Sequence, residues 1–80
     1  MIPAERLVNK LTNDLGLRCV TRGQKIGLFK GRVRGVERVA TVNMEHDRLD
    51  ELTVRHTLRL AGCEVDEIEG FIAQNRCLDG

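Results

Sequence analysis

The chain has 80 residues, of which 41% are apolar and 31% charged; this composition is typical of one small globular domain, here residues 1–80, and not of a disordered segment. The longest apolar runs cover only a few residues, so no membrane association is expected, and Met1 is not followed by a basic and then an apolar region, which favours a cytoplasmic protein. The formal net charge of +1 excludes neither nucleic acid nor protein as a partner.

The first predicted element is an amphipathic helix over residues 3–15, in which apolar side chains recur at helical spacing. Pro3 suits the first helical position because its missing N–H has no helical partner there. Gly16 is expected to end the helix. The predicted buried stripe consists of Leu7, Val8, Leu11 and Leu15.

Three strands with a two-residue period are predicted next, over residues 17–22, 26–30 and 36–44. A turn at 23–24 separates the first two, and a basic turn at 31–35, with glycine at both ends, separates the last two. Because the strands are short and the turns tight, we expect an antiparallel meander.

Helical periodicity returns after His46, with Asp47, Asp50 and Thr53 as candidate N-caps and Gly62 as the C-terminal stop. A short extra helix and a tail that frays from residue 75 are expected to follow. The order α-β-β-β-α predicts a two-layer α+β domain with a core over about residues 5–72. The predicted apolar positions of the two helices are Leu52, Val54, Leu58, Ala61, Val65, Ile68, Phe71 and Ile72.

The three cysteines, Cys19, Cys63 and Cys77, are widely spaced and form no C-x-x-C pair. Neither histidine lies at metal-ligand spacing from them. We therefore expect reduced thiols, two of them in the core, and neither a metal nor a cofactor.

Charge is divided between the two halves of the chain. Residues 18–38 hold seven basic residues against one acid, whereas residues 39–80 hold four arginines against nine acids. The basic half favours binding to phosphates, although strand alternation can equally produce an ordinary solvated sheet face. With only two aromatic residues, a duplex is a better ligand than a single strand, which needs stacking platforms. The predicted nucleic-acid-binding residues are Arg22, Lys25, Lys30, Arg32, Arg34 and Arg38.

The run R-L-D-E-L-T-V-R-H-T-L-R-L-A-G-C-E-V-D-E-I at residues 48–68 resembles the HicA, or YcfA-like, toxins of bacterial toxin–antitoxin pairs. Arg22-Gly23 and Phe29 also fall at matching places, and the resemblance covers about residues 5–72. It implies a fold like the double-stranded-RNA-binding domain (dsRBD), an mRNA interferase activity and a HicB-like antitoxin partner. The resemblance also favours RNA over DNA as the ligand.

The chain departs from this family where the resemblance implies the catalytic histidine, in a G-S-H turn. The same place reads Gly23-Gln24-Lys25. Lysine, with an ordinary pKa of about 10.4 against about 6.5 for histidine, is a poor general acid–base near neutral pH. We therefore expect nucleic-acid binding without the family's cleavage. His46 is the alternative catalytic candidate, which leaves an active ribonuclease as a third hypothesis.

The acidic half supports an alternative function, a protein-binding module that acts as an antitoxin or as a phage or mobile-element inhibitor of a host protein. A second copy of the chain, in a homodimer, is another possible partner. For nucleic acid, we expect Arg32 and Arg34 in the basic turn to dominate phosphate binding. Arg55 and Arg59 are expected to pair with acids of their own helix at i,i+4 spacing, and His56 to be a surface residue.

Overall fold

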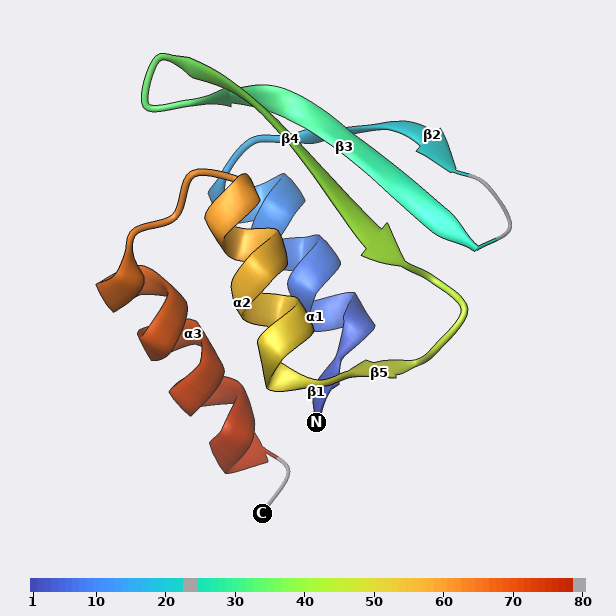
Figure 1. Cartoon of the computed structure of the whole chain (residues 1–80), viewed down its shortest axis with the longest axis vertical. Helices are drawn as coiled ribbons and strands as arrows, with labels where there is room; N and C mark the ends of the chain where they lie inside the picture. The colour runs from blue at the N-terminus through green and yellow to red at the C-terminus, as the bar shows by residue number, and fades with distance from the viewer. Residues whose placement is uncertain (23–24, 79–80) are drawn as a thin grey trace.

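The computed structural model describes residues 1–22 and 25–78, without the side chains of residues 21–22 and 76–78. Helices lie against one face of an antiparallel sheet, in two layers (Figure 1). The sheet has the order β2-β3-β4, formed by Arg18–Arg22, Ile26–Val33 and Val36–Asn43. The predicted fold class and the order α-β-β-β-α are confirmed.

The first helical segment consists of α1, Ala4–Asn9, and a π-helical turn η1, Lys10–Asp14. Leu7 and Leu11 are fully buried, as their spacing predicts. Gly16 adopts a φ of +76°, which favours glycine, and ends the segment as expected. The π-helical turn was not predicted, because hydrophobic spacing does not distinguish it from a regular helix.

Pro3 does not begin the helix, contrary to the expectation. With a ψ of 132° it is extended, and it belongs to the two-residue strand β1, Ile2–Pro3. This strand pairs antiparallel with β5, Arg48–Leu49, in the register Ile2 with Leu49. The pairing was not predicted because it joins residues far apart in the sequence.

The β3–β4 hairpin is longer and its turn tighter than predicted. The register is continuous from Ile26 opposite Asn43 to Val33 opposite Val36. The turn holds only Arg34 and Gly35, with φ values of 54° and 79°; two left-handed residues are typical of the tight hairpin turn that matches strand twist. The predicted five-residue turn at 31–35 is therefore wrong.

Gly31 lies inside β3, where it permits a close approach. A Cβ at this position would lie 3.0 Å from Leu17 Cδ2 and 3.2 Å from the Gly16 carbonyl oxygen. The glycine thus lets the end of the first helical segment pack against the middle of the sheet. It is a packing residue and not a turn residue.

Helix α2, Glu51–Leu60, starts after Asp50, one of the predicted N-caps, and ends near Gly62, whose φ is +93°. Its buried stripe repeats at positions 54, 58 and 61. Leu52 is 74% exposed, contrary to the expectation, because it lies about 200° around the helix from position 54 at 100° per residue.

Helix α3, Val65–Leu78, is 14 residues long and not the short element expected. Ile68, Phe71 and Ile72 are buried as predicted, whereas Val65 is exposed. The helix continues through Asn75, which is 3% exposed, instead of fraying there. Its buried contacts supply the stabilisation that its sequence alone does not suggest.

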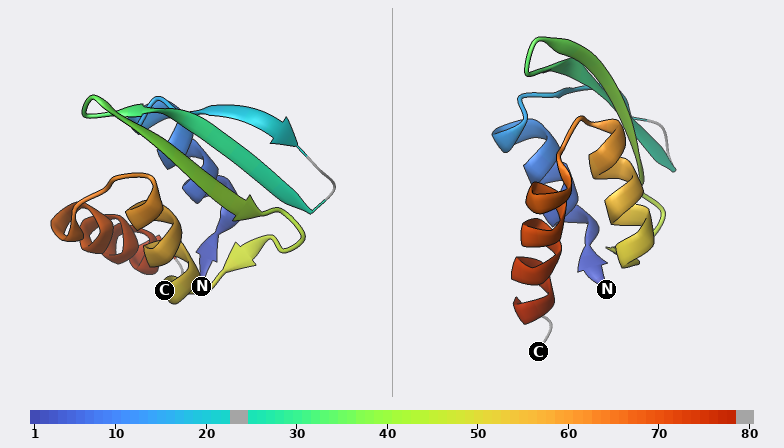
Figure 2. Two further views of the ribbon diagram at one scale, coloured as in Figure 1. Left: turned by 45° about the horizontal axis from the view of Figure 1, so that its top comes forward. Right: turned by 60° about the vertical axis from the view of Figure 1, so that its left-hand side comes forward.

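The core lies between the sheet and the helices. Two views show α1 and α2 beneath the sheet and α3 beside α2, further from the strands (Figure 2). The opposite, outer face of the sheet is not covered by any element of the described chain. Within the described residues, no helix combines the length and apolar character that crossing a membrane requires. The inner face of the sheet contributes Phe29, Val33, Ala40 and Val42 to the core.

Candidate nucleic-acid interface

Three basic residues gather on the outer face of the sheet, and we call them the outer-face cluster: Arg18, Lys30 and Arg32. Arg18 lies directly opposite Lys30 in the β2–β3 register, and all three side chains are exposed. Opposed residues on such a sheet have Cβ atoms roughly 4.5–5.5 Å apart, so two like charges there repel each other. The arrangement is therefore electrostatically unfavourable.

The outer-face cluster keeps its charges available to solvent. Among the described residues, no hydrogen bond or ion pair engages any of its three side chains. Glu37 on β4 lies opposite Arg32 and is the one acid in the adjoining positions of that face. The cluster therefore presents a net positive, uncovered surface.

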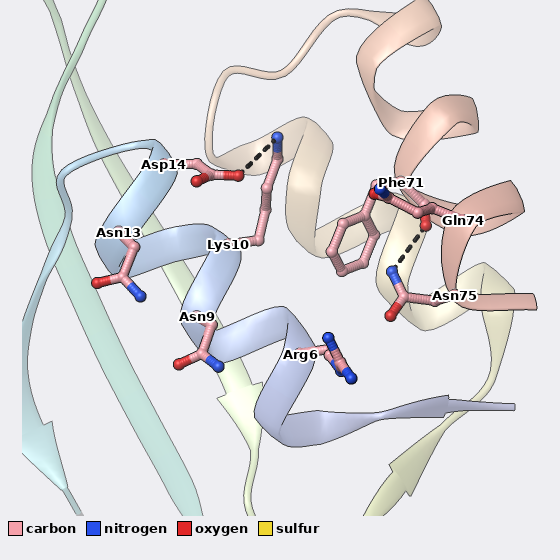
Figure 3. A pocket seen from close by; sticks show the side chains of 8 residues that line it. All are labelled: Arg6, Asn9, Lys10, Asn13, Asp14, Phe71, Gln74 and Asn75. Carbon is pink, nitrogen blue, oxygen red and sulfur yellow. Dashed lines mark hydrogen bonds and ion pairs between the residues drawn. The ribbon is translucent and has the colours of Figure 1, made fainter. Parts of the chain in front are cut away.

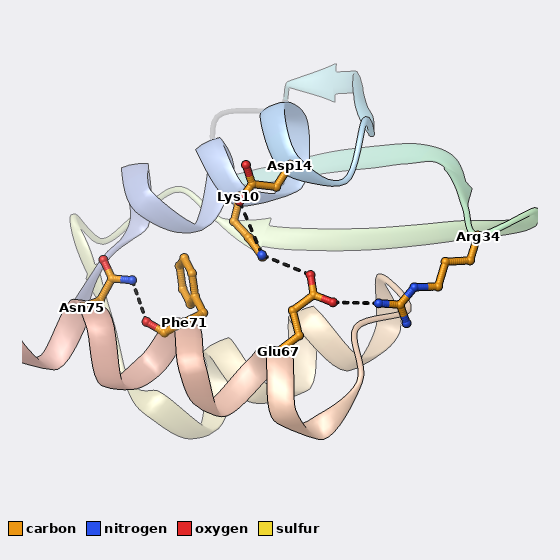
Figure 4. Close-up of polar contacts among 6 residues, drawn as sticks. All are labelled: Lys10, Asp14, Arg34, Glu67, Phe71 and Asn75. Carbon is orange, nitrogen blue, oxygen red and sulfur yellow. Dashed lines mark hydrogen bonds and ion pairs between the residues drawn. The ribbon is translucent and has the colours of Figure 1, made fainter.

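Arg34, which the sequence places in a phosphate-binding turn beside Arg32, is directed to helix α3 instead. Its guanidinium lies 3.0 Å from Glu67 Oε1 (Figure 4). It also lies 3.2 Å from Glu64 Oε1. Because Glu64 directly precedes α3 and Glu67 lies in its first turn, these ion pairs hold the hairpin tip against the helical layer. Arg34 is therefore not part of the outer-face cluster.

Arg38 is also withdrawn from the outer face. It lies opposite Gly31 on the inner side of the sheet, and its Nε is buried without a hydrogen-bond partner among the described residues. A Cβ on Gly62 would lie 3.0 Å from this nitrogen, so the arginine packs against the link between α2 and α3. The sequence contained a signal for this inward position. Alternate residues of a strand lie on the same face, and Arg38 alternates with the buried residues Ala40 and Val42.

The other predicted binding residues lie at the far end of the sheet. Lys25 is exposed just before β3, and its carbonyl oxygen accepts a 2.6 Å hydrogen bond from the Met44 N–H. Arg22 is opposite Gly27 in the register, but its side chain lies outside the described part of the structure, as do Gly23 and Gln24. The structure thus brings together Lys30 and Arg32 of the predicted set.

Arg18 was not in the predicted set, although it belongs to the basic half. Its place beside Lys30 depends on the β2–β3 register, which shifts between Cys19 and Thr21. Such a bulge changes which side chains share a face. No sequence pattern in β2 reveals the shift.

A network of ion pairs centred on Glu67 joins three parts of the fold. Lys10 Nζ lies 3.1 Å from Glu67 Oε2 and 3.4 Å from Asp14 Oδ2 (Figure 4). Burial lowers the pKa of Lys10, but the hydrogen bonds and charges of Glu67 and then Asp14 outweigh it, so its net pKa is raised. Glu67 therefore links η1, the hairpin tip and α3.

Arg55 is engaged as well, mainly across to the neighbouring helix. Its Nε and Nη2 donate to the two carboxylate oxygens of Glu69 on α3 at 2.8 and 2.9 Å. The expected i,i+4 partner, Glu51, is also present but at 3.8 Å. Like Glu64 and Glu67, Glu69 thus forms an intramolecular ion pair.

The cysteines differ in their surroundings. Cys63 is buried, and burial, with the neighbouring Glu67 carboxylate, raises the pKa of its thiol to about 11. Cys19 is exposed, so the expectation of two core cysteines does not extend to it, and the side chain of Cys77 lies outside the described residues. No cluster of potential metal ligands occurs within the described part of the chain.

His46, the alternative catalytic candidate, is exposed in the loop after β4. It lines a groove of about 640 Å³ together with residues of α1 and β5. The Met44–Lys25 backbone bond holds this loop beside the start of β3, near the position of the histidine that the family resemblance implies. His56 is exposed on α2, as predicted.

These features define the class of protein as a small two-layer α+β domain with a basic, uncovered sheet face. In comparisons with known proteins, no family model, curated protein or solved structure matches the chain. The resemblance to HicA toxins accordingly remains a prediction.

Proposed function

We propose that this domain binds the phosphate backbone of duplex nucleic acid, preferentially double-stranded RNA, through the outer-face cluster. The observation that carries the proposal is the direct opposition of Arg18 and Lys30 on an uncovered face, with Arg32 beside them and no ion pair to any of the three among the described residues. A phosphate row relieves this repulsion and releases counterions from the nucleic acid. The HicA resemblance supports RNA as the ligand.

The distribution of acids favours this proposal over the protein-binding alternative. Glu64, Glu67 and Glu69 are engaged with Arg34, Lys10 and Arg55. They are therefore less available to a basic partner than the sequence suggests. The outer-face cations, in contrast, are engaged with no described residue.

Binding is tested by fluorescence anisotropy with a labelled 20-base-pair RNA duplex and the matching DNA duplex across a salt series. Three phosphate contacts give a log–log salt slope of roughly −3, at about 0.9 per contact. The double variant Lys30→Ala, Arg32→Ala should reduce the slope by about two and weaken binding to all sequences alike.

The matched control is Arg55→Ala, Arg59→Ala, which removes the same charge from α2. It should leave duplex binding nearly intact, because these arginines lie in the helical layer. If the control abolishes binding and the cluster variant does not, the proposal fails and the binding surface lies on the helices. Absence of duplex binding at low salt would overturn it as well.

A ribonuclease that uses His46 is a second candidate, favoured by the bond that places its loop beside Lys25. A lysine that reaches a phosphate can stabilise the negative charge that develops on it during cleavage. We expect no cleavage when the purified protein is incubated with a long mRNA. Reproducible cleavage that disappears in His46→Ala would promote this candidate.

A further inference from the structure

A polar pocket of about 400 Å³ lies between the first helical segment and α3, in the helical layer (Figure 3). Its size is within the range of small-molecule sites. Its walls are rich in carboxamides and carry an aromatic ring. The lining residues used in the argument are Arg6, Asn9, Lys10, Asn13, Phe71 and Asn75. The carboxylate of Asp14 lines the pocket as well, and it is paired with Lys10 at 3.4 Å.

Asn75 has a buried hydrogen-bond acceptor without a partner. The residue is 3% exposed, and its Nδ2 donates to the Phe71 carbonyl oxygen at 2.8 Å. This bond determines the orientation of the amide, so the other atom is the Oδ1 acceptor, which is buried and unpaired within the described residues. Leaving a buried acceptor unpaired is unfavourable, and a ligand N–H in the pocket would satisfy it.

The opposite wall is formed partly by the π-helical turn η1, which contributes Lys10 and Asn13. Single π-helical turns are rare and are often found at functional sites, because they redirect side chains that a regular helix would place elsewhere. This irregularity is independent of the unpaired Asn75 acceptor. Both features face the same pocket.

A cation and the edge of a mostly buried aromatic ring, 9% exposed, also line the pocket. The amine of Lys10 is engaged by Glu67 and Asp14, whereas Arg6 is exposed and makes no ion pair among the described residues. The Phe71 ring faces the pocket between Lys10 and Asn75 (Figure 3). An acceptor for an N–H, an aromatic surface and a guanidinium thus surround one space.

We propose that this pocket binds a nucleotide whose base carries an amino group. The amino group donates to Asn75 Oδ1, the base packs against Phe71, and the 5′-phosphate pairs with Arg6. The same chemistry is offered by a free nucleoside monophosphate and by the 5′-phosphorylated end of a strand. The site is separate from the outer-face cluster, since it lies in the helical layer.

Isothermal titration of the full chain with AMP, CMP and GMP should show saturable binding. Ribose 5-phosphate, which lacks the base, and adenosine, which lacks the phosphate, should each bind at least tenfold more weakly. A short single strand with a 5′-phosphate, compared with the same strand bearing a 5′-hydroxyl, distinguishes a strand end from a free nucleotide. No binding of any nucleotide at millimolar concentration would overturn the proposal.

Asn75→Leu removes the acceptor and keeps the number and branching of the side-chain heavy atoms. It should weaken AMP binding at least tenfold while raising the melting temperature, because an unpaired buried atom is lost. Arg6→Gln, an exposed change that does not threaten folding, should weaken AMP but not adenosine. AMP binding that survives both changes would refute the site.

The outer-face variant Lys30→Ala, Arg32→Ala is the matched control. It should bind AMP as the unaltered protein does, and Asn75→Leu should bind the RNA duplex unchanged. The two proposals can therefore fail independently of each other.

Discussion

Replacement of Glu67 by alanine tests the ion-pair network that holds the hairpin tip to the helices. The Lys10 and Glu67 side chains are 14% and 26% exposed, so their pair is partly protected from water and contributes about 1 kcal/mol. The Arg34 pair, with an arginine that is 54% exposed, adds about 0.5 kcal/mol after screening by solvent. A carboxylate in the first turn of a helix adds about 0.5 kcal/mol more.

The expected loss in free energy of unfolding for Glu67→Ala is thus about 2 kcal/mol. In a domain of this size it lowers the melting temperature by roughly 8–16 °C. Thermal unfolding followed by circular dichroism measures the change. The variant should also weaken the attachment of the hairpin tip, seen as faster amide exchange around Arg34.

Asp66→Ala is the matched control for the stabilisation that a carboxylate in the first turn of α3 provides. Asp66 lies in the same first turn of α3 and is exposed, so its loss should cost only about 0.5 kcal/mol. The difference between the two variants isolates the ion pairs. Equal destabilisation by Glu67→Ala and Asp66→Ala would refute the network as a stabilising feature.

Other expected outcomes concern the buried thiol and two glycines. Because the pKa of Cys63 is raised from 9.0 to about 11, its contribution to stability is complete below pH 9 and lost as pH rises toward 11. Denaturant unfolding should show this decline, by about 2 kcal/mol, and Cys63→Ala should reduce it. Gly70→Ala, in open space on α3, should raise stability by about 0.5–1 kcal/mol. Gly31→Ala should lower it by about 1–3 kcal/mol, measured in the same way, because its Cβ meets Leu17.

Local patterns predicted the elements of this fold well. Helical spacing identified Leu7 and Leu11, and Gly16 and Gly62 marked helix ends because a left-handed φ favours glycine. The two-residue period predicted the meander, since alternation follows from the geometry of a strand. These signals are local, so the sequence by itself was sufficient for the fold class and the order α-β-β-β-α, but not for the short β1–β5 pair or the π-helical turn.

The positions of the charged side chains depended on the tertiary structure. Arg32 and Arg34 look equivalent in the sequence, yet one lies on the outer face and the other pairs with Glu67, about thirty residues away. Arg38 is withdrawn against Gly62, and Arg18 enters the cluster through a shifted register. Contacts between residues distant in the sequence leave no local periodicity. The composition therefore predicted a basic half of the chain but not which of its basic side chains lie together on the outer face of the sheet.

The pocket beside Asn75 shows most clearly the difference between what local sequence patterns predict and what tertiary contacts decide. The sequence suggested a frayed end at this residue, because a polar asparagine near a terminus has no apolar stripe to mark it as buried. In the tertiary structure, where α3 packs against α2 and β1, this residue is only 3% exposed and its acceptor is unpaired within the described residues. The sequence determined that the first helical segment and α3 form, and only their placement in three dimensions created the pocket between them.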